Sequence, residues 1–282
     1  MNQQYGQDRR KGSMWKGIAL LIAAVLVAGG YWLWQQPAQQ ASEPQPTASA
    51  PVTVSPPPLA ATPSTPAIEH PLPAAEPAVQ DAPELPTLEN SDGPAREALA
   101  GAAGDRLISE WLQSTDLIRR VVVTVDNLPR ESLPMPLRLV RPVPGAFATA
   151  TAGDEKVLAP ANYARYRPLL KLVQSISPHT LAEAYIRFYP LFQQQYRSLG
   201  YPDAYFNDAL VRAIDNLNRT PDIREPIELV QPKVLYKFAD PALENLSIGQ
   251  RMMLRMGPDN VVLAKQLLRA FRQEITGRAP KP

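Results

Sequence analysis

The chain has 282 residues, 32 prolines, two histidines, no cysteine and a formal net charge of +2. Without cysteine the chain cannot be a lipid-modified lipoprotein or use a thiol nucleophile, and it cannot build a zinc site from cysteine and histidine. The prolines are concentrated in one region, so the chain is best divided into residues 1–16, 17–34, 35–94 and 95–282.

An uncharged apolar stretch follows the basic first sixteen residues. Residues 17–34 read GIALLIAAVLVAGGYWLW, and as a helix they would be about 27 Å long, close to the thickness of a bilayer core. Aromatic residues stand at both ends, as in interfacial belts. The positive-inside rule therefore predicts a cytoplasmic tail at 1–16 and a transmembrane signal anchor at 17–34 in an inner membrane. It places the rest of the chain in the periplasm.

A cleaved signal peptide is the alternative interpretation of this stretch. Ala28 and Gly30 are small residues of the kind that precede a cleavage site. However, the apolar run continues through Tyr31–Trp34, whereas polar chain ordinarily follows such a site. We therefore expect an uncleaved anchor.

Residues 35–94 have the composition of a linker. They contain fifteen prolines and seven acidic residues, with no lysine or arginine. Such a sequence cannot bury enough apolar surface to offset the entropy cost of ordering it. We expect a disordered, semi-extended Pro/Ala-rich linker that includes His70, with a maximum reach on the order of 180 Å.

Residues 95–282 are predicted to form one periplasmic domain. Apolar residues return in periodic order, and 25 Lys and Arg stand against 19 Asp and Glu, a net charge of +6. A domain of this length buries roughly 70% of the surface of its unfolded chain. Its periodicity is mostly helical, so we predict a mainly α, multi-helix globular domain with one or two small β elements.

Two helices are predicted in the first part of this domain. One covers Asp105–Gln113, and the second runs from an expected N-cap at Asp116 to Leu128, where Pro129 ends it. The β-branched run RVVVTV inside the second helix is the argument for a strand instead. The spacing of its apolar residues favours the helix.

A β-hairpin is expected at residues 147–159. Four prolines between 132 and 144 prevent a long helix there. The sequence FATATAGDEKVLA then alternates around a Gly-Asp turn. We interpret it as a surface hairpin, and a mobile lid is the functional alternative.

Two helices are predicted to follow this hairpin. The first begins after Pro160. The second is expected to open with a capping box at Thr180–Glu183. Since Pro190 interrupts it, we expect a kink near Tyr189.

The next predicted helix begins at Pro202, after Gly200 ends the preceding one. Its apolar residues recur at helical spacing on one side. Asp208 and Arg212 are four residues apart and are expected to pair on its outer side.

Short strands and a long helix complete the domain. The sequence PIELVQPKVLYKF at 226–238 alternates, and Pro232 confines any strand there to an edge or a bend. The long helix begins at Pro258 and buries a stripe that contains Phe271. The basic residues on another face are Lys265, Arg269 and Arg272.

The stretch QRMMLRMGPDN at 250–260 is interpreted as a corner between two helices. Met252 and Met256 lie on one apolar stripe, and methionine fills irregular gaps between helices. Gly257 would supply a left-handed turn, and Pro258 would begin the next helix.

Several separated motifs give the folded part a family resemblance. They are VDNLPR at 125–130, YPLFQQQYRSLGYPDAYFNDALVRAIDNL at 189–217, VLYKFADP at 234–241 and GQRMMLRMGPDN at 249–260. In this order they make the chain resemble the bacterial Domain of Unknown Function 3014 family over roughly residues 100–277. The resemblance implies a single-pass envelope protein of Gram-negative bacteria. It brings no established activity and no catalytic residues.

The sequence offers little for catalysis. It contains no G-x-S-x-G, no phosphate-binding glycine loop and no calcium loop. His179 follows Pro178 at a helix start, where an exposed or cap-adjacent histidine is usual. Asp240 and Glu244 are a carboxylate pair of the kind glycosidases use, but helix caps and surface ion pairs explain such pairs more simply. We expect no catalytic residue, no cofactor and no metal.

Five basic residues are the candidates for contact with a partner or an anion. Arg251 and Arg255 are four apart and are predicted to share an outer face, where they need a carboxylate of the domain or an external anion. The alternative is a solvated helix face without function. The candidates are Arg251, Arg255, Lys265, Arg269 and Arg272.

Two functions are compatible with this layout. The first is an inner-membrane-anchored periplasmic binding or scaffold protein that contacts an envelope protein or a cell-wall polymer and has no catalytic activity. The alternative is an envelope hydrolase that uses paired carboxylates. Nucleic acid is not expected as a partner, because the predicted compartment contains little of it.

Overall fold

The computed structural model describes residues 67–73, 84–103 and 105–277 of the chain. In these residues helices dominate and two small antiparallel sheets are present, which confirms the predicted mainly α class. No helix among them is both long and apolar enough to span a membrane, and the predicted anchor at 17–34 lies outside the described residues.

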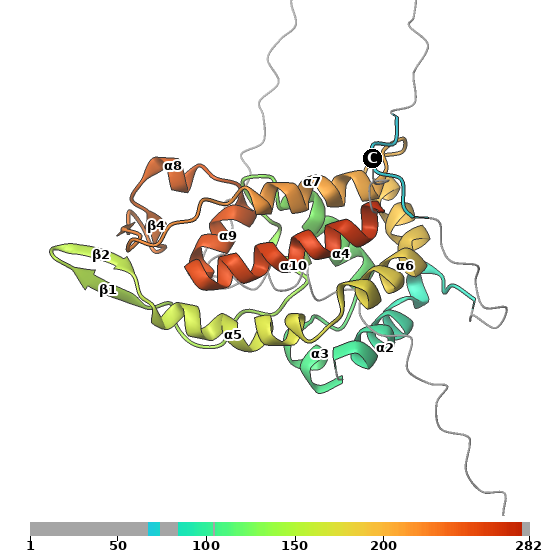
Figure 1. Ribbon diagram of the computed structural model, residues 1–282, viewed down its shortest axis with the longest axis horizontal. Coiled ribbons are helices and arrows are strands. Elements are labelled where there is room, and N and C mark those ends of the chain that lie inside the picture. Colours follow the sequence, from blue (N-terminus) through green and yellow to red (C-terminus); the bar gives the residue numbers. More distant parts are fainter. Residues whose placement is uncertain (1–66, 74–83, 104, 278–282) are drawn as a thin grey trace, which may run out of the picture.

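Helix α10 (Pro258–Thr276) runs through the middle of the helical part (Figure 1). It packs against α5 (Ala161–Gln174), α6 (Pro178–Ser198), α7 (Phe206–Asn218) and α9 (Ile248–Met256). Its apolar stripe is buried as predicted, because apolar side chains at helical spacing face these neighbours. The side chains of the stripe, each at most 2% exposed, are Val261, Ala264, Leu268, Phe271 and Ile275.

Helix α4 (Leu117–Asn127) resolves the ambiguity of RVVVTV in favour of a helix. It packs on α6 and α7, and α2 (Asp92–Ala103) and α3 (Asp105–Trp111) lie beside each other, with α2 against α4 (Figure 1). Helix α2 begins three residues before the predicted domain boundary at 95. The last residues of the predicted linker are therefore helical.

The amino-terminal end of α4 is capped by a residue of another helix. The carboxylate of Asp92 in α2 accepts the N–H of Asp116 at 2.7 Å and the N–H of Leu117 at 2.8 Å. Asp116 itself has a φ of 56° and its side chain makes no capping hydrogen bond. Asp116 is the N-cap residue as predicted, but the capping acceptor comes from Asp92, a residue that local spacing does not reveal.

Helix α6 begins earlier than predicted. Ser177 is its N-cap and Pro178 its first residue, so the capping box predicted at Thr180 is wrong. The helix runs through Pro190 to Ser198, close to the end predicted at Gly200. Pro190 removes one helix hydrogen bond, and burial of the residues that follow it, such as Phe192, offsets that loss.

Helix α7 begins at Phe206 and not at Pro202. Gln193 of α6 accounts for the difference. Its side-chain oxygen accepts the N–H of Phe206 at 2.8 Å, and its amide nitrogen donates to the carbonyl of Ala204 at 2.8 Å. These bonds hold the preceding residues in a loop. Gly200 follows the end of α6 with a φ of 104°, as expected of a glycine at that position.

Aromatic side chains from three helices meet in the core near the start of α7. The ring centroids of Tyr185 and Phe192 are 5.6 Å apart, and those of Phe192 and Phe206 are 5.7 Å apart. Phe271 of α10 meets Tyr185 edge-on at 6.0 Å. This packing fixes the first turn of α7 against α6 and α10.

The predicted hairpin is present and projects from one end of the molecule (Figure 1). The strands are β1 (Thr149–Ala152), β2 (Glu155–Leu158), β3 (Leu229–Val230) and β4 (Lys237–Phe238). Strands β1 and β2 pair with each other, as do β3 and β4, and the N–H of Leu158 also donates to the carbonyl of Ile227 at 2.9 Å. A second, smaller core lies beneath them, formed by Leu158, Ile227, Leu229, Phe238 and Leu254.

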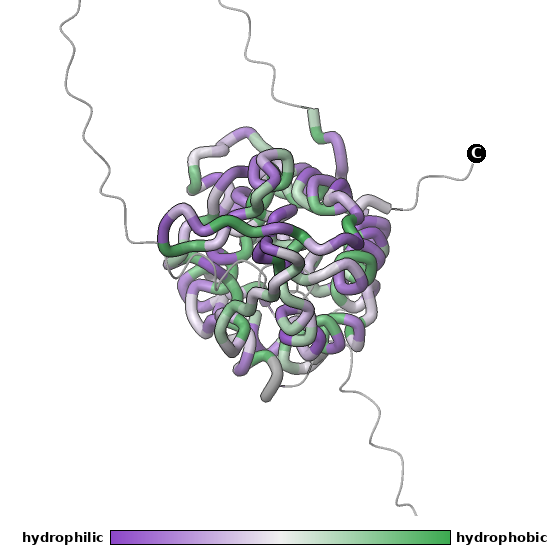
Figure 2. Tube along the Cα trace, turned by 90° about the vertical axis from the view of Figure 1, so that its left-hand side faces the viewer, coloured by the Kyte–Doolittle hydropathy of each residue, from purple (hydrophilic) through white to green (hydrophobic). Residues whose placement is uncertain are grey.

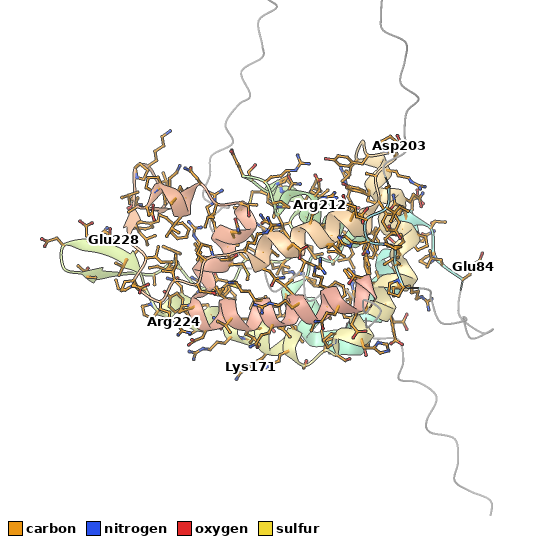
Figure 3. All side chains as sticks on the ribbon, turned by 45° about the horizontal axis from the view of Figure 1, so that its top comes forward. Glu84, Lys171, Asp203, Arg212, Arg224 and Glu228 are labelled. Atoms are coloured by element: carbon orange, nitrogen blue, oxygen red, sulfur yellow. The ribbon has the colours of Figure 1, made fainter. Side chains whose placement is uncertain are left out.

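Polar and apolar residues alternate along the helices. Figure 2 views the molecule from the hairpin end and shows hydrophilic and hydrophobic stretches following one another along the tube. In Figure 3, Arg224 and Glu228 lie near the hairpin end, and Asp203 and Glu84 lie near the opposite end.

Candidate functional site

The two arginines of α9 lie inside the domain. Arg251 is 8% exposed and Arg255 is 2% exposed, so the prediction that they share an outer face is wrong. Helix α9 has packing partners on several sides, and all of its residues are buried. The two guanidinium groups therefore interact with other parts of the domain.

Glu244 is the carboxylate that Arg251 requires. Nη1 of Arg251 donates to Oε1 of Glu244 at 3.0 Å, and Nη2 donates to the carbonyl of Glu131. The second oxygen of Glu244 accepts the N–H of Phe238 at 3.0 Å. Lys237 adds a weaker contact to Glu244 at 4.0 Å. This carboxylate is engaged by an internal cation and by the backbone of β4.

Arg255 lies against an aromatic ring. Its guanidinium carbon is 4.4 Å from the centroid of Phe238, a cation–π contact. Burial lowers the pKa of Arg255 to about 10, and Glu244 opposes this shift. Burial also raises the pKa of the nearby Tyr166 to about 12. The group is a charged cluster in the interior and not a surface for an anion.

The other half of the predicted carboxylate pair has a local role. Oδ1 of Asp240 accepts the N–H of Ala242 at 2.8 Å and caps α8 (Pro241–Glu244). With Glu244 paired to Arg251, the interpretation of the two carboxylates as a helix cap and an ion pair is confirmed. The ion pair is mostly buried, however, and does not lie on the surface.

His179 lies at the exposed start of α6. Its ring nitrogens are 3.2 Å from a carboxylate oxygen of Glu274 and 3.5 Å from one of Glu183. The histidine side chain is 68% exposed, which matches the predicted exposed position. Within the part of the chain that the structure describes, no three acidic or histidine side chains are placed to hold a metal ion.

Two of the three basic residues of α10 also have internal partners. Nζ of Lys265 donates to the carbonyl of Thr220 at 2.6 Å and to Oδ1 of Asp222 at 2.7 Å. Arg272 makes a bidentate pair with Asp215, at 2.7 Å and 3.0 Å. Arg269 is exposed, so it is the member of this set that faces solvent.

The predicted helix corner at 250–260 is confirmed. Met252 and Met256 are fully buried, and Gly257 has a φ of 88° between α9 and α10. A Cβ atom at this glycine would lie 2.3 Å from the ring of Tyr163. The corner is therefore held by close packing of α5 against the turn.

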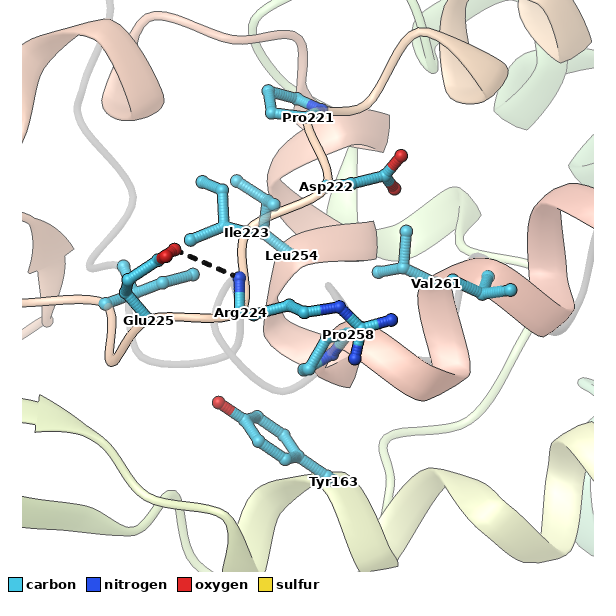
Figure 4. A pocket seen from close by; sticks show the side chains of 11 residues that line it. Tyr163, Pro221, Asp222, Ile223, Arg224, Glu225, Leu254, Pro258 and Val261 are labelled. Carbon is cyan, nitrogen blue, oxygen red and sulfur yellow. Dashed lines mark hydrogen bonds between the residues drawn. The ribbon is translucent and has the colours of Figure 1, made fainter.

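A small pocket lies beside this corner (Figure 4). Its volume is about 20 Å³, room for one water molecule and far below the roughly 300–1,000 Å³ of small-molecule sites. Arg224 and Glu225 line the pocket, and the carboxylate of Glu225 accepts a hydrogen bond from the backbone N–H of Arg224 at 3.3 Å. Its lining also includes Tyr163, Leu254 and Val261. This pocket does not suit an organic substrate.

A more specific arrangement lies at the end away from the hairpin, at the start of α7 (Figure 1). Here residues 67–73, which we call the strap, run along the domain. Asp208 is 6% exposed, and its two carboxylate oxygens accept the N–H of His70 at 2.7 Å and of Glu69 at 3.2 Å. A charged acceptor makes such bonds shorter and stronger than neutral ones. The prediction that Asp208 pairs with Arg212 on the outer side is therefore wrong.

Two neighbours of Asp208 also bind the strap backbone. Nδ2 of Asn207 donates to the carbonyl of His70 at 2.9 Å. The hydroxyl of Tyr205 accepts the N–H of Leu72 at 3.4 Å. Segments about 137 residues apart in sequence are thus joined through main-chain groups.

Residues of the domain also orient the side chain of Asn207. Its Oδ1 accepts a hydrogen bond from the hydroxyl of Tyr185 at 3.0 Å, and its Nδ2 also reaches the carbonyl of Ile275 at 3.3 Å. Burial raises the pKa of Tyr185 well above its ordinary value, so its hydroxyl is a permanent donor near neutral pH. The asparagine is held in place by the core and not only by the strap.

Comparison with known protein families assigns the chain to one of them. A family described as Protein of unknown function (DUF3014) matches residues 117–272, more than half of the chain. The chain belongs to this family. No curated protein and no solved structure matches it. The resemblance inferred from the sequence motifs is therefore confirmed.

The motifs that indicated DUF3014 meet in space around α9. The N–H of Ile248 donates to the carbonyl of Arg130 at 2.7 Å, and the N–H of Gly249 donates to that of Leu128 at 3.0 Å. From another motif, Asn216 accepts a hydrogen bond from the hydroxyl of Ser247 at 2.7 Å. In this DUF3014 protein, residues of these motifs therefore hold the start of α9 in position.

The strap site was missed by reasoning from the sequence of this DUF3014 protein. The sequence predicts a disordered linker at His70 and an outer face for Asp208. Two signals were available. The sequence Ala67–His70 interrupts the proline-rich composition with an isoleucine and a histidine, and an Asn-Asp pair stands in the first turn of a predicted helix. Neither signal points to the other.

Proposed function

We propose that this DUF3014 protein is anchored in the inner membrane by residues 17–34 and binds another component of the periplasm through its helical domain, without catalysing a reaction. The observation that carries the proposal is the apolar stretch itself. It has no charge over eighteen residues, and basic residues stand only on its amino-terminal side. The partner would be an envelope protein or a cell-wall polymer.

The geometry of the domain favours binding over catalysis. The carboxylates of Asp240 and Glu244 are engaged by a helix end and by Arg251. At the start of α7, in contrast, Asp208 and Asn207 are directed at the backbone of an extended segment. Main-chain recognition of extended segments is a common way in which proteins bind peptides.

The proposed orientation is tested with reporter fusions after residue 282. Alkaline phosphatase is active only after export, and green fluorescent protein fluoresces when it folds in the cytoplasm. We expect an active phosphatase fusion and a dark fluorescent fusion. Replacing the four basic residues of the first sixteen by serine should weaken this orientation, since they set it. A fluorescent carboxyl-terminal fusion with inactive phosphatase would overturn the proposal.

The proposed binding role is tested by crosslinking in cells and affinity capture of the whole chain. We expect the same envelope component to be captured when a cleavable signal peptide replaces residues 1–34, because the domain and not the anchor makes the contact. Failure to recover any envelope protein or cell-wall fragment in either form would contradict a binding role.

A further inference from the structure

We propose that the start of α7 is a binding site for an extended, proline-containing peptide of a partner protein, and that the strap, residues 67–73 of the same chain, occupies and closes it. The inference rests on the proposed binding role and names its class of partner. Its test uses purified protein, so its outcome is independent of whether the chain is anchored in a membrane.

The site recognises main-chain groups in a fixed order. Asp208 accepts two consecutive N–H groups, those of Glu69 and His70, and Asn207 donates to the carbonyl of His70. Pro71 has no N–H, and the next bond is made by the N–H of Leu72. A ligand must therefore offer two consecutive N–H groups and a third two residues later, and the position between them needs no N–H, so a proline fits there.

The side chains of the strap contribute less than its backbone. Ala67, Ile68 and Glu69 are exposed, and Ile68 is 55% exposed. Leu72 is partly buried and packs on the main core. Since the site contacts few side chains of the strap, other peptides with the same backbone hydrogen-bonding pattern and the same leucine fit the site.

The site is built largely by the domain. Asn207 is fully buried and is fixed by Tyr185 and by the carbonyl of Ile275, both outside the strap. Asp208 belongs to the first turn of α7, where the helix dipole favours a negative charge. A peptide that replaces the strap therefore meets donors and acceptors that are already oriented.

The strap competes with any partner because it belongs to the same chain. A tethered ligand acts at an effective concentration of the order of millimolar. A free peptide of the same sequence must therefore bind the wild-type protein poorly. Weakening the strap without changing the site should open it.

The test measures binding of a labelled synthetic peptide, PAIEHPLPA, to the full chain in detergent by fluorescence anisotropy. The strap variant is Glu69→Pro with His70→Pro, which removes the two N–H groups that Asp208 accepts. The matched control is Ala67→Pro with Ile68→Pro, which adds the same number of prolines outside that pair. We expect the strap variant to bind the peptide at least tenfold more tightly than the wild type and the control do.

Two changes then test the site itself. In the strap variant, Asp208→Asn should weaken peptide binding at least tenfold, with melting temperature and circular dichroism showing that the fold is kept. If that substitution unfolds the domain, a peptide with prolines at the positions of Glu69 and His70 serves instead and should not bind. No binding to the strap variant, or binding that neither change weakens, would overturn the site.

Cleavage of the wild-type chain after Glu69 by a glutamate-specific protease provides a second measurement. Saturating peptide with glutamine at the position of Glu69, which the protease does not cut, should accelerate this cleavage several-fold by displacing the strap, and the proline-substituted peptide should not. Cleavage that is fast without peptide and unchanged by it would show that the strap does not close the site. A wild-type dimer that dissociates when peptide is added would assign the strap to a second copy of the chain and overturn closure within one chain.

Discussion

Glu244 and Arg251 form an ion pair at 3.0 Å in which the carboxylate side chain is 15% exposed and the guanidinium side chain is 9% exposed. The pair joins the end of α8 to α9 and is completed by the N–H of Phe238 and the carbonyl of Glu131. A buried charge is costly without its counterpart, so each member depends on the other.

Glu244→Gln should destabilise the domain, because it removes the carboxylate charge that pairs with the buried Arg251 guanidinium. The expected loss of unfolding free energy is about 2–4 kcal/mol, measured by urea denaturation. Lys237→Gln is the control, since that lysine is 50% exposed and 4.0 Å from the same carboxylate. It should cost less than about 1 kcal/mol. Similar losses in the two variants would contradict the assignment of Arg251 as the main partner.

Elements with one apolar face could be predicted from the sequence. In α10 apolar spacing alone decides which face is buried, and the hairpin follows from alternation around a Gly-Asp turn. In the nine-residue helix α9 the buried stripe of Met252 and Met256 could be predicted in this way, but the burial of Arg251 and Arg255 could not. Apolar and basic residues are both buried there because the helix has neighbours on several sides, and spacing does not report the number of neighbours.

Contacts between distant segments account for the other errors. Asp92 caps a helix 24 residues further along the chain, and Asp208 accepts N–H groups of the strap 138 residues before it. In the sequence, Asp208 has a local partner in Arg212, and the nearest capping residue for α4 is Asp116. A side chain with two possible partners takes the one that the tertiary fold brings near, and one sequence contains no signal for that choice.

Gly249 is required where α9 approaches α4. A Cβ atom there would lie 2.6 Å from Cδ2 of Leu217 and 2.9 Å from the carbonyl oxygen of Leu128, which belongs to the backbone and cannot easily move. Gly249→Ala should therefore destabilise the domain by about 1–3 kcal/mol. Gly93→Ala in α2 is the matched control, because its Cβ would meet nothing within 4 Å. It should stabilise by about 0.5–1 kcal/mol, and thermal unfolding of both variants checks the opposite signs.

The cap of α4 predicts that substitutions of two aspartates change the stability of the domain in opposite directions. Asp92→Ala removes the acceptor of two N–H groups and should cost about 1–2 kcal/mol in unfolding free energy. Asp116→Gly should stabilise by up to about 1 kcal/mol, because glycine tolerates the φ of 56° better than aspartate does. Chemical denaturation of both variants measures the difference. If Asp116→Gly is the more damaging change, the cap has been assigned to the wrong carboxylate.

Stability at alkaline pH should depend on Tyr166 and Arg255 with opposite signs. Burial raises the pKa of Tyr166 to about 12, so from about pH 10 to 12 its hydroxyl stays protonated in the folded chain and ionises in the unfolded chain. The unfolded state then binds fewer protons, and stability falls as pH rises. The contribution is complete below pH about 10 and is lost by about 1.4 kcal/mol per pH unit above it.

Arg255 reverses this slope, because burial lowers its pKa to about 10 and the folded chain releases the proton first. Above about pH 10 the unfolded state binds more protons at this group, so its contribution to stability rises with pH. Tyr166→Phe should therefore flatten the alkaline loss of stability, and Arg255→Met should steepen it. Urea midpoints between pH 9 and 11 measure both slopes, and the other tyrosines contribute equally to each variant. Parallel curves for wild type and both variants would show that neither group titrates as a buried side chain.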